Sequence, residues 1–305
     1  MLHKYPPVPT ILVTGSNGQV GFELRRSLAP LGRVVALDRA GCDLANPDAL
    51  RQAVRDVRPD IIVNPAAYTA VDKAETEAEV AFAINGVAPG ILAEEARAVG
   101  GLLVHYSTDY VYAGTGDSPY VETDAVSPLS VYGKSKFAGE QAIAEAGAQA
   151  IVLRTCWVAG AHGGNFAKTM LKLGRERESL RVIADQFGAP TTASLIADVT
   201  AHIVDRYWLH GDREAFPVGT YHLAASGETS WHGYATEVLR YAAAKGVALK
   251  VDPEAIEAIP ATAYPLPAPR PANSRLNTSK LRSTFDIHLP DWQQGMHHLL
   301  DQVLS

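Results

Sequence analysis

The sequence predicts a doubly wound α/β fold, a parallel sheet with helices on both faces, that carries a smaller C-terminal substrate-binding cap. Three observations predict this fold class. Short apolar runs are typical of strands buried on both faces, amphipathic stretches of helix length separate them, and this alternation stops after about residue 155. Because strands that alternate with helices pair in parallel through right-handed crossovers, the first half should form one doubly wound sheet.

The expected strands are the apolar runs of the first half. They cover residues 11–14, 34–37, 61–64, 102–106 and 151–153. The stretches between them carry apolar residues at a spacing of three to four, which is the period of an α-helix. These helices are expected at 19–31, 47–57, 77–99 and 131–145.

The second half changes to Gly-rich loops, such as 159–164, and to a Pro-dense stretch at 260–271. That stretch can be neither a regular helix nor a central strand. Helices are expected at 193–208, 231–245 and 291–303, and 221–224 is a candidate strand. We therefore divide the chain into residues 1–155 and residues 156–305, with some segments of the second region returning to the sheet.

Length and composition exclude several classes of protein. With 305 residues, 47% of them hydrophobic and 20% charged, the chain can bury a sizeable core and is neither disordered nor repetitive. Its net charge of −6 disfavours nucleic acids and anionic membranes as partners. Cys42 and Cys156 lack metal-ligand spacing and suit a reducing compartment, and residues 1–10 lack the apolar run of a signal peptide. We expect a soluble, cytoplasmic protein.

A glycine-rich turn joins the first expected strand to the first expected helix. Gly15, Gly18 and Gly21 are spaced as GxxGxxG. Glycines at these positions allow a tight turn and a close approach of the backbone to a pyrophosphate, and the helix N-terminus offers free N–H groups. A purely structural turn is the alternative, but the strand–turn–helix context favours a dinucleotide cofactor.

Asp38 ends the second expected strand, where a carboxylate can accept hydrogen bonds from the adenosine ribose. This favours NAD, but the adjacent Arg39 could pair with a 2′-phosphate, so NADH and NADPH both stay open. Asp38 could instead cap a turn. Asp43 and Leu44 suit the edge of an adenine, although Asp43 could also cap the next helix.

Tyr132 and Lys136 lie four residues apart on one face of an expected helix. A nearby ammonium lowers the pKa of a phenol, which gives a general acid that can protonate a carbonyl oxygen as hydride arrives. Thr108 follows the fourth expected strand, at the edge where such sheets bind ligands, and its hydroxyl can contact the phenol or the substrate. Tyr241 and Lys245 have the same spacing without such a neighbour, and we assign them to a helix surface.

These motifs resemble the extended short-chain dehydrogenase/reductases, which have a Rossmann-like fold, and more closely their reductases of dTDP-linked 4-keto-6-deoxysugars. The similarity covers nearly the whole chain. The matching stretches are GSNGQVGFEL (15–24), AAYTAVDKAE (66–75), HYSTDYVY (105–112), VYGKSKFAGE (131–140), RTCWV (154–158), NFAKTML (165–171), DQFGAPT (185–191), TAYPLPAPRPANSRLNT (262–278) and LPDWQ (289–293). The resemblance implies hydride transfer from NADH or NADPH to carbon 4 of dTDP-6-deoxy-L-lyxo-4-hexulose, giving dTDP-L-rhamnose.

The resemblance also implies a role for each matched residue. Tyr132 would donate the proton, Lys136 would assist it and bind the cofactor ribose, and Thr108 would tune the phenol. The other cofactor contacts implied are Gly18, Gln19 and Val20 at the pyrophosphate, Asp38 at the ribose, Asp43 and Leu44 at the adenine, and Ala67, Tyr68 and Thr69. The deoxysugar contacts implied are Thr108, Asp109 and Trp157, the last of which could instead be a core aromatic residue.

The Pro-dense stretch places Arg270 and Arg275 on either side of Asn273. Guanidinium groups suit a nucleotide diphosphate, so we expect Arg270 to bind the substrate, with surface salt bridging as the alternative. Some members of the resembled family carry a magnesium ion held by glutamates between subunits. Here Glu23 matches one such position but Ser194 replaces a glutamate, and we expect no metal.

Two rival functions remain open. The chain could be another nucleotide-sugar epimerase or dehydratase of the same superfamily, or a non-catalytic NADP-binding regulatory subunit. Besides the dTDP-sugar, the partner left open by the sequence is a second copy of the chain, in a homodimer.

Overall fold

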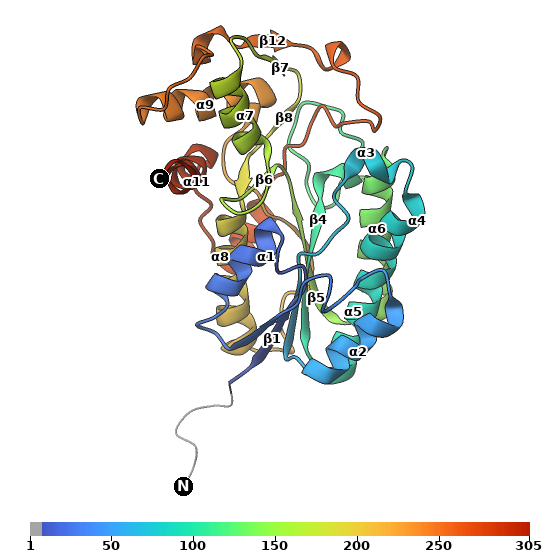
Figure 1. The fold of residues 1–305 in the computed structure, drawn as a ribbon. Coiled ribbons are helices and arrows are strands. Elements are labelled where there is room, and N and C mark those ends of the chain that lie inside the picture. The colour runs from blue at the N-terminus through green and yellow to red at the C-terminus, as the bar shows by residue number, and fades with distance from the viewer. Residues whose placement is uncertain (1–7) are drawn as a thin grey trace.

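The computed structural model describes residues 8–305, and its centre is a six-stranded parallel sheet (Figure 1). The strand order is β10-β5-β4-β3-β1-β2. The strands are β1 (Thr10–Val13), β2 (Arg33–Ala36), β3 (Ile61–Asn64), β4 (Leu102–Thr108), β5 (Gln149–Thr155) and β10 (Gly219–His222). The prediction of a doubly wound parallel sheet is confirmed. The order reverses between β1 and β3, and ligands of such sheets bind outside the carboxyl ends at this point.

Helices cover both faces of the sheet, as Figure 1 shows. One face carries α1 (Gln19–Ser27), α8 (Ala193–Ile203) and α10 (Ser279–Phe285), and the other carries α2 (Pro47–Val57), α5 (Ala88–Val99) and α6 (Val131–Ala146). Alternation along the strands explains the two cores. Ile11 and Val13 pack under α1 and α8, whereas Leu12 packs under α2 and α5.

Local sequence sets the helix that carries the Tyr/Lys pair. Ser130 caps α6 by accepting from the backbone N–H of Gly133 at 3.1 Å, and Gly147 ends the helix with a left-handed φ of 63°. The cap fixes where the first turn begins. It therefore fixes the direction in which Tyr132 and Lys136 leave the helix.

The prediction of one regular α-helix over 77–99 is wrong in the middle of that range. The chain forms α4 (Ala78–Phe82), a π-helical turn (Ala83–Val87) and then α5, preceded by a short α3 (Val71–Ala74). The wider π turn is associated with Asn85, whose side chain bonds the backbone of Tyr68. Such turns occur mostly as single-turn insertions within α-helices, so the helical character of the sequence on either side does not reveal this one.

The second half forms a smaller unit with its own core and also returns to the sheet through β10, close to the expected 221–224. Its core lies between α7 (Phe166–Glu176), α9 (Trp231–Ala244) and α11 (Trp292–Leu304). Short strand pairs brace it: β6 (Val158–Ala159) with β9 (Thr191–Thr192), β7 (Arg181–Ile183) with β12 (Glu257–Ile259), and β8 (Phe187–Gly188) with β11 (Thr229–Ser230). The Pro-dense stretch contains no regular element beyond a 3₁₀ turn at Ala261–Ala263.

Most of the N-terminal segment considered for a signal peptide, residues 1–7, lies outside the described residues. Within residues 8–305, no helix has both the length and the apolar character needed to cross a membrane.

Candidate functional site

A cavity of about 1050 Å³ opens at the carboxyl ends of the central strands. Its walls are the turn after β1, the segment after β3, the end of β4 and the first turns of α6. It is lined by every residue that the sequence assigned to the cofactor: Gly15, Gly18, Gln19, Val20, Gly21, Asp38, Arg39, Asp43, Leu44, Ala67, Tyr68, Thr69, Tyr132 and Lys136. The volume lies at the upper end of ordinary ligand sites, as a dinucleotide requires.

The turn after β1 needs its glycines for steric reasons. Gly15 has a left-handed φ of 55° and lies so close to Ala66 that an added Cβ would approach within 2.8 Å. A Cβ on Gly21 would collide with the carbonyl of Gly15. Gly18 gives α1 no side-chain cap, so the first N–H groups of this helix remain available to an anion.

The side chain of Gln19 ties α1 to the second half of the chain. Its Oε1 accepts from the backbone N–H of Gly160 at 2.8 Å and from Asn165 Nδ2 at 2.9 Å. The side-chain oxygen is thus occupied. The group of Gln19 that remains to bind the cofactor is therefore its backbone N–H, at the start of α1.

Asp38 both caps its own turn and lines the cavity. Its Oδ1 accepts from the N–H groups of Ala40 and Gly41, at 3.0 and 3.2 Å, and its Oδ2 accepts from Asn17 at 3.0 Å. The side chain of Arg39 is 81% exposed and 3.9 Å from Asp43, so it is free to meet a phosphate. The geometry admits NADH through Asp38 and NADPH through Arg39.

Tyr132 lines the cavity from the first turn of α6, and its side chain is only partly exposed there. Burial raises the pKa of its phenol to about 12, against the effect of a hydrogen bond from Thr108. The expected lowering of the phenol pKa by Lys136 is wrong in this structure. The ammonium is bonded elsewhere, and burial therefore dominates. A phenol with this pKa keeps its proton at neutral pH, which is the state that a proton donor needs.

Lys136 points into the protein between α6 and β4. Its Nζ donates to the carbonyl oxygen of Tyr106 at 2.6 Å and lies 3.2 Å from Nε2 of His105. Burial lowers the pKa of Lys136 to about 8, against the opposing charge of Glu140. The side chain is therefore mostly an ammonium at neutral pH.

Thr108 and Asp109 lie where β4 ends, next to the phenol. Thr108 donates to Asp109 Oδ1 at 3.1 Å, and burial raises the pKa of Asp109 to about 6. Among residues 8–305, Asp109 Oδ2, Ser107 Oγ and Thr155 Oγ1 are buried polar atoms without a protein partner. Of these three residues, Ser107 and Thr155 line the cavity, whereas Asp109 does not. Unpaired polar atoms beside a cavity indicate a polar ligand, since buried polar groups are otherwise paired.

Trp157 is half-buried in an unusual backbone conformation. Its φ is 46°, a region that few non-glycine residues adopt and that is often found at functional sites. The ring stacks on Trp231 with centroids 3.7 Å apart and covers Gly188. Trp157 packs against the core of the second half but is only partly buried. The core interpretation therefore holds for the packed part of the ring, and the exposed part is left for a ligand.

Arg270 and Arg275 are both paired. Arg270 Nη2 lies 2.8 Å from Asp72 Oδ2, which joins the Pro-dense stretch to α3. Arg275 donates to Asn273 Oδ1 at 2.8 Å and stacks over Phe187. The salt-bridge alternative therefore describes Arg270 in this structure. The charge of Arg270 also lowers the pKa of the nearby Tyr110 phenol, against the raising effect of burial.

Sequence reasoning missed Asn85 and His105. Asn85 accepts from Tyr68 N at 2.8 Å and donates to Tyr68 O and Ser135 Oγ, each at 3.0 Å, so it holds the cavity segment 67–69 against α6. His105 contacts Lys136 from β4. The available signal was one polar residue within each apolar stretch, Asn85 in the expected helix 77–99 and His105 in the expected strand 102–106. A polar residue in such a stretch does not by itself show which residue it contacts.

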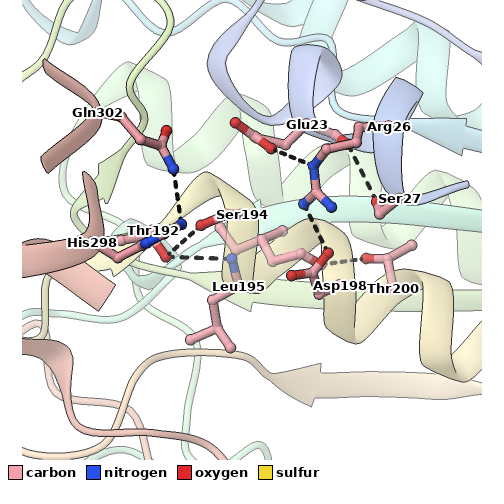
Figure 2. Close-up of polar contacts among 11 residues, drawn as sticks. Glu23, Arg26, Ser27, Thr192, Ser194, Leu195, Asp198, Thr200, His298 and Gln302 are labelled. Atoms are coloured by element: carbon pink, nitrogen blue, oxygen red, sulfur yellow. Dashed lines mark hydrogen bonds and ion pairs between the residues drawn. The ribbon is translucent and has the colours of Figure 1, made fainter. Parts of the chain in front are cut away.

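The residues present do not fit the magnesium ion implied by the family. The Glu23 carboxylate lies 3.2 Å from Arg26, whose guanidinium also contacts Asp198 at 2.9 Å, and Ser194 bonds Thr192 (Figure 2). Arg26 thus places a positive charge between the two carboxylates. Across the described part of the chain, no group of three or more His, Cys, Asp or Glu side chains could hold a metal ion.

Comparisons with known proteins find relatives that match nearly the whole chain. Residues 9–305 match the family model described as the RmlD substrate binding domain. The chain is 50% identical over 295 residues to a dTDP-4-dehydrorhamnose reductase of Burkholderia thailandensis (97% of this chain, 99% of the relative) and 50% identical over 299 residues to that of Escherichia coli K12 (97% and 98%). A solved Bacillus anthracis dTDP-4-dehydrorhamnose reductase in complex with NADP is similar with a TM-score of 0.86, at 32% identity, covering 97% of this chain and 99% of that one.

Proposed function

The chain belongs to the dTDP-4-dehydrorhamnose reductase family, and on this premise we propose that it reduces the 4-keto group of dTDP-6-deoxy-L-lyxo-4-hexulose with NADH or NADPH to give dTDP-L-rhamnose. The observation that carries the proposal is the phenol of Tyr132 in the wall of a dinucleotide-sized cavity. When bound, the reduced nicotinamide supplies the hydride.

The residues of this chain supply the proton and the orientation. Tyr132 donates its phenolic proton to the sugar oxygen as negative charge develops there. The hydroxyl of Thr108, which donates to Asp109 before the transfer, then turns to donate to the resulting phenolate and stabilises it. Lys136 binds the ribose of the cofactor and keeps a positive charge near the site. Glycine N–H groups and the N-terminus of α1 bind the pyrophosphate.

We place the deoxysugar between the end of β4 and the second half of the chain. Asp109 Oδ2, buried and without a protein partner, accepts a sugar hydroxyl, and the ring of Trp157 covers the sugar. Residues 156–305 then form most of the sugar-nucleotide-binding region, and residues 1–155 form the cofactor domain. What supports this division is that most of the residues lining the cavity belong to the first half.

The compartment is part of the same proposal. Cys42 and Cys156 are both free and buried, and burial raises the pKa of the Cys42 thiol to about 11. Neither thiol is therefore activated for oxidation at neutral pH. We propose that the protein works in the cytoplasm, where a nicotinamide cofactor is supplied.

The experiment that tests the function follows nicotinamide absorbance at 340 nm with the 4-keto-sugar generated in situ, comparing NADH with NADPH. Loss of absorbance that requires both the sugar and the protein supports the reductase and determines the preferred cofactor. Folded protein that binds nucleotide but oxidises neither cofactor contradicts it and favours an epimerase, a dehydratase or a binding subunit.

Replacing Arg270 by Ala should raise the KM for the dTDP-sugar by on the order of tenfold, because a charge-assisted hydrogen bond to the diphosphate is lost. The control is Asp72→Ala, which removes the partner of Arg270 but keeps the guanidinium. Initial rates at several sugar concentrations measure both variants. Equal KM values for the two variants would mean that Arg270 only holds the Pro-dense stretch against α3.

A further inference from the structure

The inner side of Lys136 contacts a row of polar side chains that the reaction described above does not use. Nε2 of His105 lies 3.2 Å from Lys136 Nζ, and Nδ1 of His105 lies 3.0 Å from the side-chain nitrogen of Asn64. The amide of Asn64 in turn bonds the hydroxyl of Thr14. The row crosses three adjacent strands, since His105 is paired with Asn64 in β4 and β3, and Thr14 follows β1. Each of the four side chains is at most 2% exposed.

The chemistry of an ammonium determines how this row is protonated. Lys136 has three N–H donors and no lone pair, so Nε2 of His105 must accept and the imidazole must be neutral. Burial, aided by the charge of Lys136, lowers the pKa of His105 well below its usual value, in agreement with a neutral ring. The single ring proton then lies on Nδ1. Asn64 must offer its oxygen to that proton, which requires the amide to be turned by 180° within the same space. The hydroxyl of Thr14, which donates to the amide oxygen in the unturned orientation, then accepts from the amide nitrogen.

Two of the three N–H groups of Lys136 are thereby directed into the protein. One donates to the Tyr106 carbonyl at 2.6 Å and one to His105 at 3.2 Å. The third remains for the cavity, which Lys136 lines. A residue that only filled this space would be apolar, as Leu103 is on the same face of β4.

We propose that His105 is a positioning residue for the reductase: its neutral imidazole, oriented by Asn64, takes one donor of Lys136 and so directs the remaining donor at the ribose of the nicotinamide cofactor. The proposal rests on the proposed function, in which Lys136 is the ribose ligand. The proposal adds His105 as a positioning residue, which contacts the Lys136 ammonium on the side facing away from the cavity.

The charged and titratable groups that act on Lys136 are few. His105 approaches from β4 and Glu140 from its own helix, whereas Tyr106 offers only its backbone carbonyl. Because a hydrogen bond from the ammonium favours its charged form, removing the acceptor should make Lys136 lose its proton at lower pH. The pH dependence of activity therefore reports on this contact, with Glu140 left in place.

The test compares His105→Gln with His105→Asn. The Gln amide reaches the position of Nε2 and can accept from Lys136, whereas the shorter Asn amide reaches only the position of Nδ1. Both variants keep a polar group between β3 and α6, so a merely structural role affects them alike. Wild-type kcat/KM should fall above about pH 8, where Lys136 loses its proton.

We expect His105→Asn to move this alkaline limit down by about one pH unit and to weaken NADPH binding on the order of tenfold, measured by NADPH fluorescence without the sugar. We expect His105→Gln to recover most of both losses. Equal shifts in the two variants, or no shift in either, would overturn the proposal.

A measurement on the unsubstituted protein keeps the proposal testable if both variants fold poorly. In protein labelled with ¹⁵N-histidine, the His105 ring should carry its proton on Nδ1 and stay neutral through the pH range around 6.5 in which an ordinary histidine gains its second proton. Its signal is assigned by its loss from any His105 variant that yields a spectrum, or otherwise by sequential resonance assignment. A proton on Nε2, or a ring that gains charge in this range, would refute it. Because neither NADPH binding nor the spectrum needs the sugar, these results are independent of whether the 4-keto-sugar is reduced.

Discussion

Replacing Tyr132 by Phe is expected to lower kcat by about 10²–10⁴-fold and to leave the dissociation constant of the cofactor nearly unchanged. The substitution removes one oxygen and its proton but keeps the aromatic ring, which packs edge-on against Tyr110 with centroids 5.4 Å apart. Without the phenol no side chain delivers a proton to the sugar oxygen as hydride arrives. Turnover from 340 nm absorbance and a separate NADPH titration measure the two quantities.

The chain contains a matched control for this variant. Tyr241 also stands four residues before a lysine, but its hydroxyl bonds Asp301 on the surface at 2.8 Å. Tyr241→Phe should therefore retain full turnover. If it lost activity as Tyr132→Phe does, or if Tyr132→Phe kept wild-type turnover, the assignment of the proton donor would be wrong.

The parts of the fold that were predictable are those set by local sequence. Strand 61–64 and helix 47–57 have the predicted bounds, because a short β-branched run and a Pro-initiated amphipathic stretch each determine their own limits. The helix over 77–99 was predicted as continuous, and only tertiary contacts of Asn85 account for its π turn. Helix α7 (Phe166–Glu176) was missed, although its first half lies in the matching stretch 165–171.

The same distinction applies to the candidate site. The cofactor end is built from turns that directly follow strands, so strand order together with the glycine spacing predicted that the glycine turn and Asp38 would lie close together. The segment 67–69 was implied only by the family resemblance. The substrate end depends on contacts between distant segments. The pairing of Arg270 with Asp72 and the left-handed φ of Trp157 have no local signature. The pKa of Tyr132 was predicted in the wrong direction, because spacing gives the neighbour on a helix but not its burial or its other hydrogen bonds.

Removing the carboxylate of Glu140 is expected to have the largest effect on stability, because it leaves a buried guanidinium without its counter-charge. Arg154 makes two hydrogen bonds to Glu140, at 3.0 and 2.6 Å, and one to Tyr112 at 2.6 Å. Both side chains of the ion pair are less than a tenth exposed. Glu140→Ala should therefore lower the free energy of unfolding by about 3–5 kcal/mol, as measured by urea denaturation.

An exposed pair of the same chemistry serves as the control. Glu254 contacts Arg240 at 2.8 Å with both side chains more than half exposed, and Glu254→Ala should leave the free energy of unfolding almost unchanged, because solvent screens the pair. Removing both buried charges together, as Glu140→Leu with Arg154→Met, should recover much of the loss, because no unpaired charge remains. A Glu140→Ala loss as small as that of the control would show that water reaches Arg154.

Glu140 also favours the charged form of Lys136, so the same variant should lose activity at a lower pH than wild type, which links this ion pair to the ammonium of the site.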